Sequence, residues 1–358
     1  MKIRDMDMVD VNFFIGTYST GGPYVPNARG KGIHSCTLNL KTGNIGEKHL
    51  YQDNSNSTYL CKDQEDHLFA VCDNFHEYGA VKAFRIAKDS SLELLSVQNT
   101  YGTSSCHVEY EEDSKRIFIA SYANAQLSIH GFDGKRFPGE PQVLKFQGNG
   151  PNSQRQESAH IHQAIVSPDK KWVYTCDLGS DKVWLLENAK EKVSVKTGMT
   201  IPAGSGPRHL VFHPDLPLVY VFCELDASLI TCAAEAASGI LKWISQTNTL
   251  PSDFKGDPAG AAVRIHPGGG ALYVSNRNHD SISVYSIAKD GTLSFFSNFS
   301  VRGKEPRNFN IDPTGQWLLC ANQATHTVIT FALDPETGLP TGITGSEFNC
   351  GSPVCILF

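Results

Sequence analysis

The sequence carries little charge and contains no long hydrophobic run. Only 19% of its 358 residues are Asp, Glu, Lys or Arg, and the formal net charge is −6. Because Lys and Arg are scattered along the chain, neither nucleic acid nor an anionic membrane is expected as the main partner. No window approaches the length of a membrane span, and the segment "MKIRDMDMVDVNFF", with four charged residues among its first seven, does not resemble a signal peptide. These features favour a cytoplasmic protein.

Several motifs of metal, cofactor and hydrolase sites are also absent. The ten cysteines form no Cys-x-x-Cys pair, so no structural zinc site is expected; most stand singly in apolar runs, as small buried residues with free thiols. No Gly-x-Ser-x-Gly elbow occurs in a strand-to-helix context, which argues against a serine hydrolase. The run "GGGAL" is expected in a β-turn and forms no phosphate loop or dinucleotide fingerprint. We therefore expect no metal and no cofactor.

Turn-forming residues, in contrast, are spread through the whole chain. The sequence has 31 Gly and 18 Pro, and stretches such as "GTYSTGGP" and "DPTG" recur instead of gathering in one linker. Five segments share the order strand, turn, strand and polar tip: they begin "HVEYEEDSKRIFIASY", "HQAIVSPDKKWVYTCD", "HLVFHPDLPLVYVFCE", "AVRIHPGGGALYVSNR" and "NFNIDPTGQWLLCANQ". This texture predicts many short strands in repeated units.

An apolar anchor in the second strand of each unit recurs every 46 to 56 residues. The anchors are Phe14, Phe69, Phe118, Tyr174, Tyr220, Tyr273 and Leu319. Seven such units predict an all-β fold, a seven-bladed β-propeller forming a single domain of residues 1–358. The first unit lacks an innermost strand, so we expect the apolar C-terminal segment "SPVCILF" to pair with the first blade and remove the exposed sheet edges. The competing interpretation, two β-sandwich domains, lacks a linker.

Equivalent positions of the blades lie on rings around the axis of a propeller. Counting twelve residues back from the anchors gives Ser57, Cys106, His162, Arg208, Ala261 and Arg307. Counting four residues forward gives Tyr18, Asp73, Tyr122, Leu178, Glu224, Arg277 and Gln323. Charged side chains at these levels are costly to desolvate unless they pair or face a ligand. They indicate either an ion-pair network that braces the blades or, as we favour, a functional cleft at the axis.

Two histidines stand one residue apart in "QESAHIHQAIV". Side chains alternate along a strand, so His160 and His162 are expected to point to the same side. They could bind a metal, but no third ligand is apparent. They could instead be core or turn residues. The interpretation we favour places them in a polar pocket with Arg208, Arg277 and Glu224.

The chain resembles the lactonase family of seven-bladed propellers, which contains bacterial 6-phosphogluconolactonases and fungal carboxy-cis,cis-muconate lactonizing enzymes. The resemblance extends from "FFIGTYS" through "HIHQAIVSPDKKWVYTCDLGSDKV" and "GSGPRHLVFHPDLPLVYVFCE" to "EPRNFNIDPTGQWLLCANQ", and the run G-x-G-P-R-H-x-x-F-H-P followed by Glu is quite specific. It implies a catalytic set of His160, Arg208, Glu224 and Arg277. The segment "SSCHV" departs from the family pattern, where Pro often precedes the His, which weakens any role for His107.

Further residues are expected to bind the substrate. The loop "GNGPNSQRQESAH" is similar to the family's arginine-bearing loop over the cleft and adds Arg155. Together with the two rings, this gives the predicted substrate-binding residues His162, Arg155, Arg307, Asp73 and Gln323.

The resemblance implies hydrolysis of a sugar-acid lactone, with 6-phosphogluconolactone as the first candidate. Glu224 or a neutral histidine could accept a proton from water, while Arg208 or Arg277 stabilises the oxyanion and the remaining arginines hold an anionic substrate. The same residues could close a carboxymuconate to a lactone. A propeller could also serve as an interaction scaffold without chemistry. The expected partner is a small anionic sugar lactone, and the sequence gives no sign of the oligomeric state.

Overall fold

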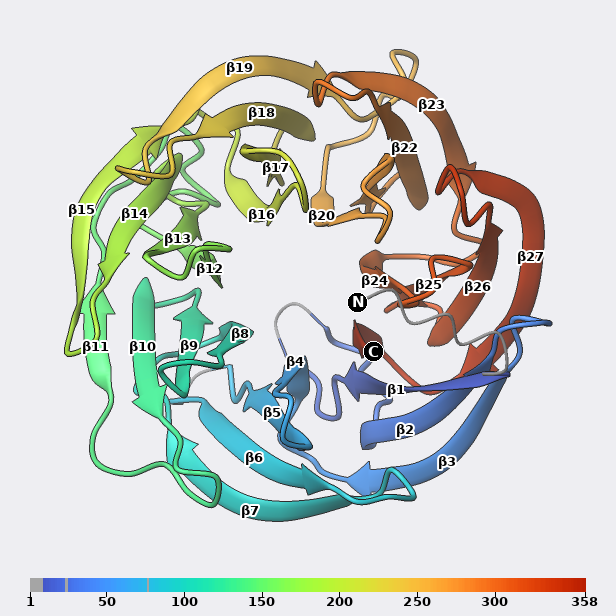
Figure 1. The fold of residues 1–358 in the computed structure, drawn as a ribbon, viewed down its shortest axis with the longest axis horizontal. Helices are drawn as coiled ribbons and strands as arrows, with labels where there is room; N and C mark the ends of the chain where they lie inside the picture. Colours follow the sequence, from blue (N-terminus) through green and yellow to red (C-terminus); the bar gives the residue numbers. More distant parts are fainter. Residues whose placement is uncertain (1–8, 23–24, 76) are drawn as a thin grey trace.

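The computed structural model of the protein describes residues 9–22, 25–75 and 77–358, which form strands and connecting loops only. These residues contain seven four-stranded antiparallel sheets, arranged as blades around one axis (Figure 1). The predicted all-β, seven-bladed propeller is therefore confirmed. The described part of the chain contains no helix that could span a membrane.

From the axis outward, the strands of blades 1 to 4 follow the same order. Blade 1 comprises β28 (Pro353–Leu357), β1 (Asp10–Thr17), β2 (Gly32–Asn39) and β3 (Ile45–Gln52). Blade 2 comprises β4 (Ser57–Lys62), β5 (His67–Cys72), β6 (Ala80–Ile86) and β7 (Leu92–Asn99). Blade 3 comprises β8 (Ser105–Glu111), β9 (Arg116–Ser121), β10 (Gln126–Gly131) and β11 (Gln142–Lys145). Blade 4 comprises β12 (Ile161–Val166), β13 (Trp172–Asp177), β14 (Lys182–Asn188) and β15 (Val193–Thr200).

Blades 5 to 7 continue this order. Blade 5 comprises β16 (Pro207–Phe212), β17 (Leu218–Cys223), β18 (Ser228–Ala234) and β19 (Leu241–Asn248). Blade 6 comprises β20 (Gly260–Ile265), β21 (Ala271–Asn276), β22 (Ser281–Ile287) and β23 (Leu293–Ser300). Blade 7 comprises β24 (Pro306–Ile311), β25 (Trp317–Asn322), β26 (Thr327–Leu333) and β27 (Pro340–Asn349). Each anchor residue of the sequence repeat lies in the second strand of its blade.

The C-terminal strand closes the ring as predicted. Strand β28 pairs antiparallel with β1, with Phe14 opposite Leu357 and Ile15 opposite Ile356. Apolar side chains fill the space between blade 1 and blade 7, where Ile356 packs in one cluster with Phe13 and Ile15. The inner edge of blade 1 is therefore covered by a segment more than 300 residues away in the sequence.

A β-bulge occurs near the start of most innermost strands. In blades 3, 4, 5 and 7 the pairing with the second strand skips one residue, which is Cys106, His162, Arg208 or Arg307. A bulge leaves its extra residue unpaired and re-aims the side chain. The skipped residues are those that the first ring count selected in these four blades.

Blade 2 departs from that count by one residue. The skipped residue is Thr58 rather than the predicted Ser57. The hairpin between β4 and β5 is one residue shorter than its counterpart in blade 3, because Cys61 lies opposite Phe69 whereas Glu109 lies opposite Phe118. Counting twelve residues back from the anchor of this blade therefore selects the residue before the bulge.

We expect Ile356→Ala to destabilise the protein by about 2–5 kcal/mol, because it deletes a buried side chain from the interface between the closing strand and its neighbours. Ile356 is 2% exposed, whereas Ile343 in the outermost strand β27 is 61% exposed and serves as the matched control. Ile343→Ala should change stability by no more than about 0.5 kcal/mol. Urea-unfolding midpoints measure both effects, and equal destabilisation by the two changes would contradict the role of β28.

Candidate active site

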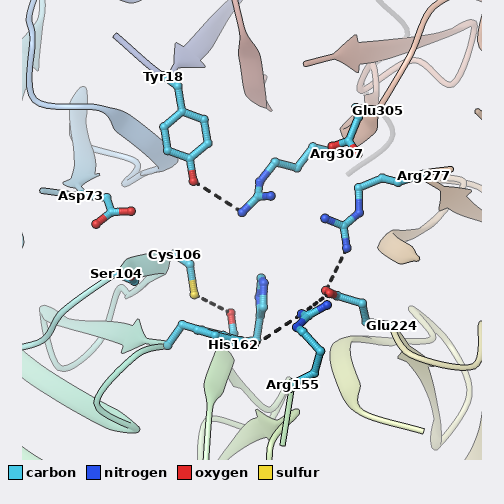
Figure 2. Close-up of a pocket in the computed structure, with 11 residues that line it drawn as sticks. Tyr18, Asp73, Ser104, Cys106, Arg155, His162, Glu224, Arg277, Glu305 and Arg307 are labelled. Atoms are coloured by element: carbon cyan, nitrogen blue, oxygen red, sulfur yellow. Dashed lines mark hydrogen bonds and ion pairs between the residues drawn. The ribbon is translucent and has the colours of Figure 1, made fainter. Parts of the chain in front are cut away.

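A cavity of about 250 Å³ lies at one end of the propeller axis, and every blade contributes to its wall (Figure 2). We call it the axial cavity. Its wall consists of Tyr18, Asp73, Ser104, Cys106, Tyr122, Arg155, His162, Glu224, Arg277, Glu305 and Arg307. The side chains come from the starts of innermost strands, from the residues that follow second strands and from the loop before β12. Sevenfold closure thus gathers residues that are far apart in the sequence.

The second ring predicted from the sequence lies at the same end of each blade. Each of its seven members is the first residue after the second strand of a blade. Its backbone N–H donates a hydrogen bond to the segment that enters the innermost strand, as from Glu224 to the carbonyl of Gly206 at 2.8 Å and from Arg277 to that of Ala259 at 2.9 Å. These bonds fix where the side chains of the ring begin.

Glu224 forms ion pairs with three arginines. Its Oε2 lies 3.0 Å from Arg208 Nε and 3.0 Å from Arg277 Nη2, and its Oε1 lies 2.5 Å from Arg155 Nη2. Burial alone would raise the pKa of Glu224, but the positive charges of the three guanidinium groups outweigh it and hold the pKa well below its usual range. Glu224 is therefore ionised at neutral pH.

The arginines outnumber the carboxylate that neutralises them. Burial and the neighbouring Arg277 lower the pKa of Arg208 to about 9, against the opposing effect of Glu224, so Arg208 remains charged at neutral pH. A fourth guanidinium, that of Arg307, forms no ion pair within the described residues. It lies 5.6 Å from the centre of the Tyr18 ring, with Nη2 3.5 Å from the Tyr18 hydroxyl. Around the cavity four guanidinium groups face the three carboxylates of Asp73, Glu224 and Glu305, which leaves a formal excess of one positive charge for an anionic ligand.

His162 reaches the axial cavity, and His160 does not. The bulge at His162 turns its ring toward the cavity, whereas His160 precedes the strand. The His160 ring stacks on Tyr122 with centroids 4.3 Å apart, and its ring nitrogens lie 3.0 Å from the Tyr122 carbonyl and 3.1 Å from the Glu157 carboxylate. Both histidines contact Tyr122, but the alternation rule did not foresee that only one faces the cavity.

The His162 ring is neutral at neutral pH. Burial, with the nearby charge of Arg208, lowers its pKa well below the usual value, although Glu224 acts in the opposite direction. The side chain is almost fully buried, and its Nδ1 has no hydrogen-bond partner within the described residues. A neutral imidazole with an unused nitrogen can accept a proton.

Six of the nine predicted site residues line the axial cavity: Asp73, Arg155, His162, Glu224, Arg277 and Arg307. Arg208 lies deeper and reaches the cavity only through its ion pair with Glu224. His160 is behind Tyr122. Gln323 follows β25 at the level of the ring and is 5% exposed, but it is not part of the cavity wall.

Five residues of the wall were not among the predicted site residues. Tyr18, Cys106 and Tyr122 belong to the two rings, but their side chains gave no specific sign of a role. Ser104 and Glu305 lie two residues before the bulged positions, with backbone φ angles of 53° and 60° in the left-handed region. A third ring, counted two residues further back along the chain than the first ring, would have included both Ser104 and Glu305.

The fold and the cavity define a seven-bladed β-propeller with a cationic small-molecule site at one end of its axis. Residues 12–358 match the family described as "Lactonase, 7-bladed beta-propeller". The chain belongs to this family, as the sequence resemblance predicted.

Relatives and solved structures match over nearly the whole chain. It is 30% identical to the 6-phosphogluconolactonase of Bacillus subtilis over 349 residues, which cover 96% of this chain and 97% of that protein. The structure of the periplasmic gluconolactonase PpgL of Pseudomonas aeruginosa matches with a TM-score of 0.88 and 26% identity, over 97% of this chain and 98% of that chain. A protein of Lactobacillus plantarum gives a TM-score of 0.90 at 26% identity, over 98% and 99% of the two chains.

We expect Glu224→Gln to lower stability at neutral pH by about 3–5 kcal/mol, because it leaves three arginines without their shared counter-charge. The pKa of Glu224 is lower in the folded protein than in the unfolded chain. The stability from its ionisation is therefore complete above the unfolded pKa of about 4.3 and is lost as pH falls through the folded pKa. The difference in melting temperature between the wild type and the variant should thus be constant from about pH 8 to pH 5 and narrow below.

Glu235→Gln is the matched control for this prediction. Glu235 pairs with Lys242 at 2.6 Å, but both side chains are exposed, so the change should have little effect at any pH. Thermal melts of the three proteins at several pH values measure the difference. If the difference in melting temperature between the wild type and Glu224→Gln grew toward acid pH, Glu224 would not be the ionised buried carboxylate described here.

Proposed function

We propose that the protein hydrolyses the lactone of a sugar acid, with 6-phosphogluconolactone as the first candidate substrate. The observation that carries this proposal is the axial cavity, whose wall holds Arg155, Arg277 and Arg307, with Arg208 behind Glu224. Together these four arginines formally exceed the three carboxylates of the wall, Asp73, Glu224 and Glu305, by one charge. Membership of the lactonase family supports lactone hydrolysis. The Bacillus subtilis relative named 6-phosphogluconolactonase supports the phosphorylated substrate. The cytoplasm remains the expected compartment.

His162 is the proposed general base. Glu224 also faces the cavity, but three guanidinium groups hold its pKa far below neutrality, which makes it a very weak base. The pKa of His162 is also lowered, but its Nδ1 has no hydrogen-bond partner within the described residues and is available to accept a proton, whereas both oxygens of Glu224 are engaged by arginines. Glu224 is then a positioning residue that holds Arg155, Arg208 and Arg277 in place.

Arg277 and Arg155 are the proposed oxyanion-stabilising groups. Their guanidinium groups lie beside Glu224 at the wall of the cavity, and each keeps N–H donors that the carboxylate does not use. Donors that are already oriented stabilise a developing oxyanion without reorganisation at the moment of reaction. In this mechanism Arg208 and His160 act indirectly, through Glu224 and Tyr122.

Arg307 is the proposed receptor for the anionic group of the substrate. It lies across the cavity from Arg155 in Figure 2, and Tyr18 is its neighbour. A guanidinium matches both phosphate and carboxylate geometry. Asp73, from the second ring, is proposed to bind a sugar hydroxyl group, whereas Gln323 lies outside the cavity wall and is assigned no contact. The reaction requires no metal or cofactor in this scheme.

We expect His162→Gln to lower kcat on 6-phosphogluconolactone by about 100-fold or more, because general-base catalysis typically contributes about 10²–10⁴-fold. Rates of acid release from 6-phosphogluconolactone, unphosphorylated gluconolactone and carboxymuconolactone establish the preferred substrate first. His34→Gln, a change at a buried histidine in β2 outside the cavity, is the control and should retain full activity. Undiminished turnover by His162→Gln would rule out the proposed base.

Arg307→Met should raise the KM for 6-phosphogluconolactone by about tenfold or more, because it removes a charge-assisted contact to the anionic group. The KM for unphosphorylated gluconolactone should change much less. Arg302→Met removes an exposed arginine from the loop that precedes β24 and should alter neither value. Steady-state kinetics on both lactones measure the difference, and a parallel loss on both would show that Arg307 does not select the anion.

A further inference from the structure

A second, smaller cavity lies deeper along the axis, directly against the axial cavity. The two share Cys106, His162 and Arg307 in their walls. The deeper one, which we call the small cavity, is further bounded by side chains that include Thr58, Arg208 and Val354. Its volume is about 10 Å³, which is the space that the centre of one water molecule needs.

The wall of the small cavity offers polar partners to such a water. His162 Nδ1 is buried and has no hydrogen-bond partner in the part of the chain that the structure describes, and the whole residue is 5% exposed. Arg208 lies in the wall with its Nη1 donating to the Ala261 carbonyl at 2.7 Å, and its guanidinium is charged. The Thr58 hydroxyl donates to the Ser105 carbonyl at 3.1 Å, which leaves its oxygen able to accept. A buried water typically makes two to four hydrogen bonds of this kind.

We propose that the small cavity holds the water molecule that attacks the lactone carbonyl. The inference rests on the proposed lactonase function and adds the location of the nucleophile. A substrate in the axial cavity would have its carbonyl above this water, with His162 between the two spaces. In this arrangement Arg208 contacts the attacking water from the wall of the small cavity, although it does not line the axial cavity.

The reaction at this place balances without a further reagent. The water oxygen forms a bond to the carbonyl carbon while His162 takes the proton, which gives a tetrahedral oxyanion next to Arg277. Collapse of this intermediate breaks the bond between the carbonyl carbon and the ring oxygen. The protonated His162 returns the proton to that leaving oxygen, and the carboxylic acid product releases its own proton to solvent.

Changes at Val354 test the proposal by altering the volume of the small cavity. Val354→Ile adds a methyl group to its wall and should lower kcat at least tenfold with KM within threefold of the wild type. Val25→Ile adds the same group to the same buried cluster of Tyr18, Val25 and Val354 but outside the cavity wall, and it should retain wild-type kcat. Melting temperatures show that each variant is folded.

Val354→Ala enlarges the small cavity. It provides a second test that can still be carried out if Val354→Ile fails to fold. In the presence of methanol it should raise the ratio of methyl ester to acid several-fold over the wild type, because the small cavity can then hold methanol as the nucleophile. Wild-type kcat in Val354→Ile, or an unchanged product ratio in Val354→Ala, would overturn the location of the water while leaving the lactonase function in place. An unmodified protein inactive on every lactone would overturn both.

Discussion

The ion pairs of Glu224 hold the axial site together. One buried carboxylate neutralises guanidinium groups from the loop before blade 4, from blade 5 and from blade 6. Three like charges at such separation repel one another strongly in a region of low dielectric constant, and the lowered pKa of Arg208, caused by burial and by Arg277, reflects that repulsion. The carboxylate makes the cluster possible, and the arginines in turn remove its basicity. In the proposed mechanism, the same contacts leave positive charge for substrate binding and leave proton transfer to the neutral His162.

The backbone places these side chains through a repeated irregularity of the innermost strands. A regular strand would send alternate side chains toward the two neighbouring blades, and few would face the axis. The bulge inserts one unpaired residue and turns it toward the channel, at Cys106, His162, Arg208 and Arg307. The propeller thus keeps its apolar interfaces between blades and still presents polar groups at the centre. In blade 6 the register also shifts by one residue, where Ala261 and Ala262 oppose Ser275, and the small side chains leave room for Arg208 to reach the Ala261 carbonyl.

The seven-bladed fold could be predicted from the sequence because the repeat reflects packing. Each unit can bury its apolar faces only against the neighbouring units, so its apolar pattern recurs along the chain. The positions of the second ring were also predicted correctly, because each lies only four residues after the anchor along the same strand. The first ring depends on the length of a hairpin, and the shorter hairpin of blade 2 moved Ser57 out of place. His160 and His162 could not be distinguished because the bulge that separates them leaves no mark in a single sequence. The deeper position of Arg208 likewise depends on packing between blades, which counting along the chain does not describe.

Neutral aromatic rings surround one side of the small cavity: Tyr59 and His209 belong to its wall, and His107 lies between them. Tyr59 and His107 have ring centroids 4.4 Å apart, and His209 lies 6.0 Å from His107 and 5.3 Å from His162. Burial first, and then Arg264 and Arg208, lower the pKa of His107 to about 3. His209 is held neutral in the same way, chiefly by burial and by Arg208. Uncharged rings can pack against Arg208 without adding to the repulsion that Glu224 already offsets, whereas lysines or protonated histidines would need a second buried carboxylate. The rings of His107 and His209 therefore add polar groups beside the small cavity without adding charge.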